Sequence, residues 1–328
     1  MTTLYVNTQG ATVQTRDGRL VVTQADLVLA DLPIETVDEV TVVGRGVGIT
    51  TPALIALGDR GVDVAFVSQR GRYYGRFIGA RGGPAAARIA QARVAASSSR
   101  ALGAARAIVI AKIHAEAALL DAHGSPADPV RRWIDPAQRV ATLDALRGVE
   151  GAAAAAYFRA YAALLPPTLG FRGRAHRPPP DLVNALLSFG YTLLLQIAIG
   201  AIQTVGLDPY LGILHVAEAR RPSFALDLIE PFRPTIDWLT LRLVSDGTIS
   251  PADTTPAGAG LRLLSDARQR VLEAFEAVAS TPIGHPLAAG RVSLRQAVTL
   301  DARAWARFFL GEAPTVASAH IADLWSAR

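Results

Sequence analysis

The segment GRFIGARGGPAAARIAQARV, residues 75–94, marks the point at which the chain changes from one structural class to another. Two glycines and a proline at 82–84 interrupt regular structure, because glycine is conformationally free and proline lacks a backbone N–H. Before this break the apolar residues alternate or form short runs, and after it they recur at spacings of three and four. This order predicts an α+β protein in which a sheet domain precedes a larger helical domain, not an alternating α/β sheet.

Residues 1–82 are predicted to form a small β domain. The runs TLYV, ATVQT, RLVV, DLVLA and DEVTVV are rich in strand-forming residues, and Asp17-Gly18 is typical of a hairpin turn. One short helix is expected within this domain, with Thr50 or Thr51 as its cap, Pro52 in its first turn and Gly61 after its end. We interpret residues 83–100 as a linker and residues 101–328 as an all-α domain.

The stretch 182–207 contains no charged residue and is long enough to cross a bilayer. Its polar residues nevertheless recur near helical spacing and form a stripe along one side: Asn184, Ser188, Thr192, Gln196 and Gln203. A helix buried among other helices can form hydrogen bonds through such a stripe, so we expect no membrane insertion. The alternative, a membrane-associated helical protein, predicts that the chain pellets with lipid.

The composition limits the possible classes of protein. Half of the residues are apolar and 19% are charged, which excludes a disordered chain. There is no cysteine, which excludes disulfides, a cysteine-based zinc site and a thiol nucleophile, and which fits a reducing compartment. The first residues lack the basic and apolar segments of a signal peptide, so we expect a cytoplasmic protein.

The basic residues are unevenly distributed along the chain. The net charge is +5, and Lys112 is the only lysine. Residues 64–115 hold nine positive charges and no acidic residue. Phosphate backbones are the commonest partner of such a segment, which favours nucleic-acid binding, although a solvated face with partners elsewhere in the chain remains the alternative.

Four residues are candidates for a metal site. In HVAEARRPSFALDLIEPFRP, residues 215–234, His215 precedes Asp227 and Glu230, which share a helical face within an apolar run. Glu150 precedes five alanines in GVEGAAAAAYF. Carboxylates with one imidazole suit Mg²⁺ or Mn²⁺. The alternatives are a satisfied core histidine, an acidic edge neutralised by nearby arginines, and a glutamate that interacts with a helix dipole.

The order of these motifs resembles one family over essentially the whole chain. The order is EGAA followed by YF, then RPPPDLVNALLSFGY, GLDPYLGILH and LDLIEPFRP, with LYVNTQG, GRGVGITTPALIAL and VAFVSQRGRYYGRF in the first part. This pattern is similar to that of CRISPR-associated protein one, the endonuclease and integrase that inserts new spacers. Such proteins have an amino-terminal β domain, through which they pair as homodimers, and a carboxy-terminal α-helical catalytic domain.

The resemblance implies specific roles. The metal ligands would be Glu150, His215 and Glu230, which bind Mg²⁺ or Mn²⁺, and Asp227 would support the site or contact the metal. The DNA partners would be a prespacer duplex, whose 3′ hydroxyls attack repeat phosphodiesters, and the CRISPR repeat, with a small CRISPR-associated protein completing the adaptation complex. The candidate phosphate contacts are arginines: Arg72, Arg76, Arg172, Arg174 and Arg177.

Two departures from the family pattern bear on the site. Pro231 stands where the family more often has an acid, and a proline there is expected to kink the helix. Ala115 and Glu116 replace the last two residues of a segment that typically reads Lys-Ile-x-Asn-Gln. Two alternatives therefore stay open, namely a metal-dependent nuclease of branched DNA in repair and a DNA-binding scaffold with a decayed metal site.

Overall fold

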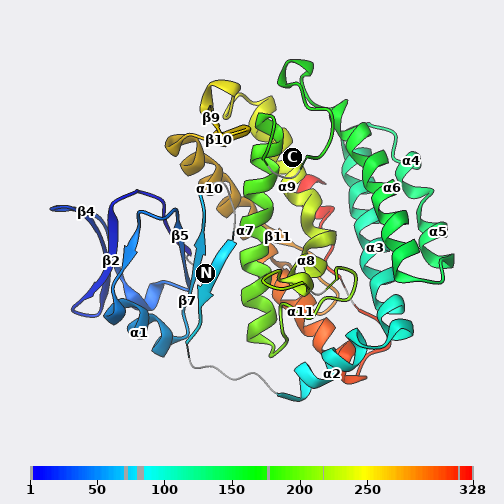
Figure 1. Cartoon of the computed structure of the whole chain (residues 1–328), viewed down its shortest axis with the longest axis horizontal. Helices are drawn as coiled ribbons and strands as arrows, with labels where there is room; N and C mark the ends of the chain where they lie inside the picture. Colours follow the sequence, from blue (N-terminus) through cyan, green and yellow to red (C-terminus); the bar gives the residue numbers. More distant parts are fainter. Residues whose placement is uncertain are drawn as a thin grey trace.

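The computed structural model describes residues 3–69, 73–79, 85–175, 178–216, 218–316 and 318–326. Its first part contains two four-stranded sheets, ordered β1-β5-β7-β8 and β4-β3-β2-β6, with one helix, α1 (Figure 1). The strands are β1 (Thr3–Val6), β2 (Ala11–Arg16), β3 (Arg19–Gln24), β4 (Leu27–Pro33), β5 (Glu39–Val43), β6 (Gly48–Ile49), β7 (Asp63–Val67) and β8 (Tyr73–Phe77).

Local sequence signals set the turns of this part. Asp17 and Gly18 both have positive φ, and they join β2 to β3 as a two-residue hairpin turn requires. The helix α1 (Thr51–Arg60) begins where the Thr50 side chain accepts a hydrogen bond from the Ala53 N–H, and it ends at Gly61 in the left-handed conformation. Both the hairpin and the helix predicted from the sequence are confirmed.

The rest of the chain is mainly helical, so the predicted α+β class is confirmed. Two short hairpins interrupt the helices, β9 (Thr254–Ala257) with β10 (Gly260–Leu263) and β11 (Pro282–Ile283) with β12 (Val292–Ser293). The helices are α2 (Ala85–Ala95), α3 (Ser98–Ala122), α4 (Asp128–Arg131), α5 (Ile134–Arg139), α6 (Leu143–Ala162), α7 (Leu182–Thr204), α8 (Ser223–Ile229), α9 (Arg233–Ser245), α10 (Ser265–Ser280), α11 (Leu294–Leu310) and α12 (Asp323–Ser326).

The apolar helix α7 forms the centre of the molecule. It is long and apolar enough to cross a membrane, but 94% of its most apolar window is buried inside the protein. Figure 1 shows it between the sheets and the remaining helices. Part of its polar stripe is used internally, since the buried Asn184 exchanges hydrogen bonds with Gly173, Arg174 and Asp181. The side chain of the buried Gln196 has no hydrogen-bond partner among the described residues. This arrangement is that of a core helix, as its polar stripe predicted.

The segment predicted as a linker, residues 83–100, is largely helical. It includes α2 and the start of α3, and α2 packs against α11. The buried Gln91 on α2 donates to the carbonyl oxygens of Asp208 and Leu211 and accepts from the Asp208 N–H at 2.8 Å. The interpretation of this segment as a linker therefore needs correction, because α2 is part of the packed helical region. Whether the two parts fold independently stays a prediction.

Ion pairs join the sheets to the helices. Arg76 on β8 contacts Glu39 at 2.6 Å and Asp63 at 3.1 Å, and it donates to the Gln196 carbonyl on α7. Arg295 on α11 bridges Glu39 and Glu276. The Arg76 side chain is only 4% exposed. The prediction of Arg76 as a phosphate contact is therefore corrected, because its guanidinium is already committed to two buried carboxylates and a carbonyl.

Candidate active site

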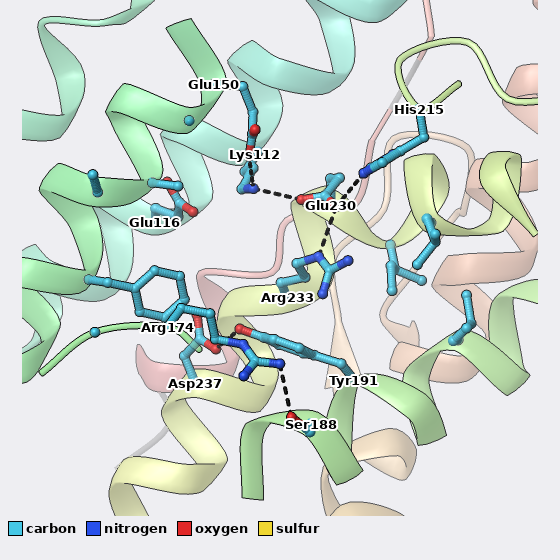
Figure 2. Close-up of a pocket in the computed structure, with 18 of the residues that line it drawn as sticks. Lys112, Glu116, Glu150, Arg174, Ser188, Tyr191, His215, Glu230, Arg233 and Asp237 are labelled. Atoms are coloured by element: carbon cyan, nitrogen blue, oxygen red, sulfur yellow. Dashed lines mark hydrogen bonds and ion pairs between the residues drawn. The ribbon is translucent and has the colours of Figure 1, made fainter. Parts of the chain in front are cut away.

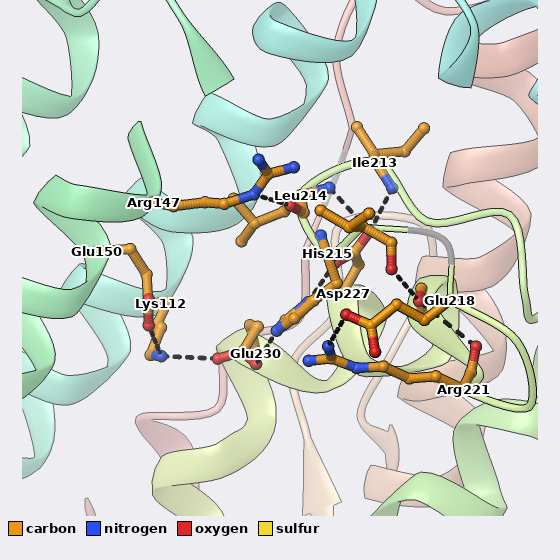
Figure 3. Close-up of polar contacts among 12 residues, drawn as sticks. Lys112, Arg147, Glu150, Ile213, Leu214, His215, Glu218, Arg221, Asp227 and Glu230 are labelled. Atoms are coloured by element: carbon orange, nitrogen blue, oxygen red, sulfur yellow. Dashed lines mark hydrogen bonds and ion pairs between the residues drawn. The ribbon is translucent and has the colours of Figure 1, made fainter. Parts of the chain in front are cut away.

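Asp227 on α8 organises the loop that carries His215. One carboxylate oxygen accepts from the Ile213 and Leu214 N–H groups at 2.6 and 3.0 Å, and the other accepts from the His215 N–H at 3.0 Å. The second oxygen also lies 2.6 Å from His215 Nδ1 (Figure 3). An ionised carboxylate can only accept, so Nδ1 carries the ring proton and Nε2 keeps a free lone pair. With four such partners, the fully buried Asp227 orients His215, and it is not placed to bind a metal itself.

Asp227 and Glu230, which the sequence places on one helical face, lie on either side of the end of α8, just before Pro231. After α8 the chain makes a 3-10 turn, Glu230–Phe232, before α9 begins at Arg233. Proline cannot donate the hydrogen bond that would continue α8, so the expected kink is present. Asp227 thus contacts the loop before α8, whereas Glu230 contacts residues of α3 and α9. Asp227 therefore faces the loop of His215, whereas Glu230 faces Lys112 and Arg233, and the metal ligands stay a prediction.

Lys112 on α3 lies between Glu150 and Glu230 (Figure 2). Its ammonium forms a short ion pair with Glu150 on α6 and a second pair with Glu230 at 2.7 Å. Burial by itself would lower the pKa of Lys112, but attraction to Glu230, Glu116 and Glu150 raises that pKa above its usual value. An ammonium ion held by two carboxylates therefore occupies the centre of the site.

Glu230 is held in its ionised form. Burial by itself would raise the pKa of Glu230, but attraction to Arg233 and Lys112 lowers it below its usual value. Arg233 donates to Glu230 at 2.9 Å, and His215 Nε2 lies 3.9 Å from the same Glu230 oxygen. Two ligand atoms of one small cation are separated by about 3 to 4 Å. His215 Nε2 and Glu230 are thus placed as two ligands of one ion would be.

A cluster of aromatic and charged residues contacts Arg233, the residue that donates to Glu230. Arg233 stacks over the Tyr191 ring at 4.6 Å, and Tyr191 donates its hydroxyl proton to Asp237 on α9. Tyr157 on α6 donates to the other oxygen of Asp237 at 2.7 Å. Burial raises the pKa of Asp237 to about 6, although both hydroxyls favour its ionised form. The cluster fixes the position of Arg233 and, through it, that of Glu230.

These groups line a cavity of about 940 Å³ between α3, α6, α7 and α9. Six cationic side chains border it: Lys112, Arg159, Arg172, Arg174, Arg221 and Arg233. Arg174 donates to Asn184 at 2.9 Å and to Ser188 at 3.0 Å, and burial lowers its pKa. Arg172 and Arg174 line the cavity, and their role as phosphate contacts stays a prediction, whereas Arg72 and Arg177 lie outside the described residues.

A family model described as CRISPR associated protein Cas1 matches residues 4–277. The chain belongs to the Cas1 family. It is 38% identical over 287 residues to CRISPR-associated endonuclease Cas1 1 of Thermus thermophilus, covering 87% of this chain and 89% of the relative. It is 35% identical over 259 residues to CRISPR-associated endonuclease Cas1 of Mycobacterium tuberculosis, covering 76% and 75% of the two chains. The predicted enzyme class is confirmed at the level of the family.

Solved structures share the fold. A casposase bound to its integration product has a TM-score of 0.88 at 20% identity, with 96% of this chain and 92% of that chain covered. A Cas1 protein from Thermotoga maritima has a TM-score of 0.85 at 23% identity, with 94% and 97% covered. The fold of this chain is thus shared by both solved structures.

The described residues contain no group of three His, Asp or Glu side chains close enough together to hold a metal ion as they stand. Lys112 explains this, since its ammonium separates Glu150 from Glu230 and takes the position of a cation. The two carboxylates that hold the ammonium, together with the imidazole nitrogen that faces one of them, are a donor set that suits a small divalent cation. The residues of this Cas1 family member therefore fit the metal that the resemblance implies.

Sequence reasoning missed the roles of Lys112, Arg233 and Asp237. Lys112 entered only as part of the basic segment, and Arg233 only as a counter-ion of an acidic edge. The signal for two of them was present, because Glu230, Arg233 and Asp237 are separated by three and four residues and share one helical face. Lys112 had no such signal, since its partners come from other helices.

Proposed function

We propose that the protein is a metal-dependent DNA endonuclease and integrase that inserts new spacers into a CRISPR array. The observation that carries the proposal is the position of Glu230 between the two other predicted ligands at the wall of an arginine-lined cavity: one of its oxygens shares the Lys112 ammonium with Glu150, and the other faces His215 Nε2. Membership of the Cas1 family supports the same conclusion.

Glu150, His215 and Glu230 would hold Mg²⁺ or Mn²⁺. A divalent cation held by these residues would supply Lewis acidity for polarising a phosphodiester and for stabilising negative charge on the attacking and leaving oxygens. The protein contributes the arrangement around it. Asp227 holds the imidazole in the tautomer whose Nε2 can bind, and Arg233 holds the Glu230 carboxylate in place.

The substrate of the reaction would be DNA. We propose that the 3′ hydroxyl of a prespacer duplex attacks a repeat phosphodiester in the cavity, so that one P–O bond forms as another breaks. Arg172 and Arg174 at the cavity wall would bind the phosphates, because a guanidinium matches two phosphate oxygens. Arg72 and Arg177 remain predicted contacts from the sequence alone. The casposase of the same fold was solved with its integration product.

Two partners complete the proposal. The edge strand β4 exposes Leu27, Val28 and Leu29, which are 62%, 54% and 40% exposed. An apolar edge strand of this kind favours pairing with a second chain, which supports a homodimer through the sheet part. The fold also resembles a chain of a solved Cas6-RT-Cas1–Cas2 complex, which supports a small CRISPR-associated partner protein. We propose that the reaction takes place in the cytoplasm. DNA is found there, and the absence of cysteine fits a reducing compartment.

A joining assay tests the proposal. The protein, the small partner protein and a short duplex with 3′ hydroxyls are incubated with a repeat-bearing plasmid, with Mg²⁺, with Mn²⁺ or with chelator. We expect half-site products only with a divalent ion, and their loss in Glu150→Ala, His215→Ala and Glu230→Ala variants that remain folded. Glu312→Ala, at an exposed position, is the matched control and should retain full activity.

The products distinguish the proposal from its alternatives. Cleavage of branched DNA without any half-site product would indicate a repair nuclease. DNA binding that is insensitive to divalent ions, with no joining at all, would indicate a scaffold without a working metal site. Full joining by any of the three alanine variants would remove that residue from the site.

A further inference from the structure

The cation position of the active site is already filled by a side chain of the protein itself. The Lys112 ammonium contacts Glu150 and Glu230, which are two of the three proposed metal ligands. A divalent ion cannot enter between these carboxylates while the ammonium stays, because two cations a few ångströms apart repel strongly in a buried site. Binding of one divalent ion by Glu150 and Glu230 together therefore requires that Lys112 moves.

One carboxylate is placed to receive it. Glu116 lies one turn further along α3, at the i+4 position from Lys112, and side chains at this spacing are neighbours. Glu116 is 2% exposed, lines the same cavity, and its Oε2 has no hydrogen-bond partner among the described residues. Figure 2 shows Glu116 beside the Lys112–Glu150 pair. Burial raises the pKa of Glu116 to about 8, and a cation placed beside this carboxyl group would favour its ionised form. A buried carboxyl oxygen without a partner is costly, so a partner in another state of the site is expected.

The other carboxyl groups at the cavity are less suitable. Asp237 accepts hydrogen bonds from Tyr157 and Tyr191, which occupy one oxygen each. Glu150 and Glu230 would themselves be taken by the metal. Arg233 already donates to Glu230 and stacks on Tyr191, so it need not move.

We propose that Lys112 is the counter-ion of the metal-free site and that it moves to Glu116 when a divalent cation binds. Glu116 is then a positioning residue, which lowers the cost of displacing the ammonium from Glu150 and Glu230. This inference rests on the metal site of the proposed function.

The single lysine of the chain makes the movement directly observable. Protein labelled with ¹³C and ¹⁵N only in lysine has one side-chain ammonium signal, provided that the expression tag contains no lysine. We expect this signal to shift on titration with Mg²⁺ to a second, saturable position in the wild-type protein. In Glu230→Gln, the same titration should leave the signal in place at Mg²⁺ concentrations that saturate the wild type.

Metal affinity measured by calorimetry with Mn²⁺ tests the role of Glu116. Lys112→Met should bind Mn²⁺ about tenfold more tightly or better, because the competing charge is gone. Glu116→Gln should bind about tenfold more weakly, yet the same substitution in the Lys112→Met background should change affinity less than about threefold. A purely direct attraction between Glu116 and the ion predicts equal effects in both backgrounds and would refute the proposed exchange.

The outcomes separate this inference from the proposed function. If the wild type binds Mn²⁺ and Glu230→Gln does not, the metal site stands. A lysine signal that stays unchanged at saturation, or weaker Mn²⁺ binding by Lys112→Met, then refutes the exchange alone. Absence of Mn²⁺ binding by the wild type would overturn both the metal site and the exchange.

Discussion

Replacing Asp227 by asparagine tests how the protein prepares His215. Asparagine has nearly the same shape but only one accepting oxygen, whereas Asp227 accepts four contacts. The favoured orientation keeps that oxygen on the Ile213 and Leu214 N–H groups, because two donors are satisfied there. The amide NH₂ then faces the His215 ring, so Nδ1 must accept a hydrogen bond and the ring proton moves to Nε2.

The size of the effect follows from these contacts. The His215 N–H loses its acceptor in a buried site, which should lower the free energy of unfolding by about 1 to 3 kcal/mol. Protonated Nε2 cannot bind a metal, so the ring must change tautomer first. Loss of a group that orients a histidine ligand typically weakens metal binding about 10- to 100-fold, or about 1.4 to 2.8 kcal/mol.

Calorimetry with Mn²⁺ and urea denaturation measure the two effects separately. Asp301→Asn is the matched control, because Asp301 accepts from His285 Nε2 at 2.7 Å in a second buried pair. It should be destabilised to a similar extent and keep wild-type metal affinity. Wild-type Mn²⁺ affinity in Asp227→Asn, or an equal loss in Asp301→Asn, would show that the tautomer of His215 does not control metal binding.

Three further substitutions test the framework around the site. Arg76→Met removes the guanidinium that pairs with Asp63 and with one oxygen of Glu39. The free energy of unfolding measured by urea denaturation should fall by about 3 to 5 kcal/mol, and no measurable loss would contradict the role of these ion pairs. Gly190→Ala would place a Cβ 2.4 Å from Ile236 Cγ2. The free energy of unfolding should fall by about 1 to 3 kcal/mol, which a lower melting temperature would report. An unchanged melting temperature would show that α7 and α9 can separate freely. The pKa of Asp237 in the folded protein is about 6, above its ordinary value of 3.8, so the folded state holds the proton more tightly than the unfolded state. The free energy of unfolding should therefore fall as the pH rises between these two values, by up to about 1.4 kcal/mol per pH unit. Asp237→Asn should remove this component, and an identical pH profile in wild type and variant would contradict the raised pKa.

Much of the fold followed from local patterns. The change of apolar spacing at residues 82–84 separated the sheets from the helices. Asp17-Gly18 and the Thr50 cap set a hairpin and a helix boundary through hydrogen bonds within a few residues. The linker prediction was wrong because glycine and proline show where regular structure breaks, but not where it resumes. The packing of α2 against α11 involves residues about two hundred positions apart.

The candidate site, like the fold, was determined partly by local sequence and partly by tertiary packing. The sequence by itself determined the residue types, the kink at Pro231 and, through motif order, the three proposed ligands. Only the tertiary structure decided that Asp227 turns toward the His215 loop while Glu230 turns toward α3, because a one-residue break in a helix redirects side chains that are neighbours in sequence. It also placed Lys112 between Glu150 and Glu230, since an ion pair between helices depends on how those helices pack and leaves no periodic pattern in the chain.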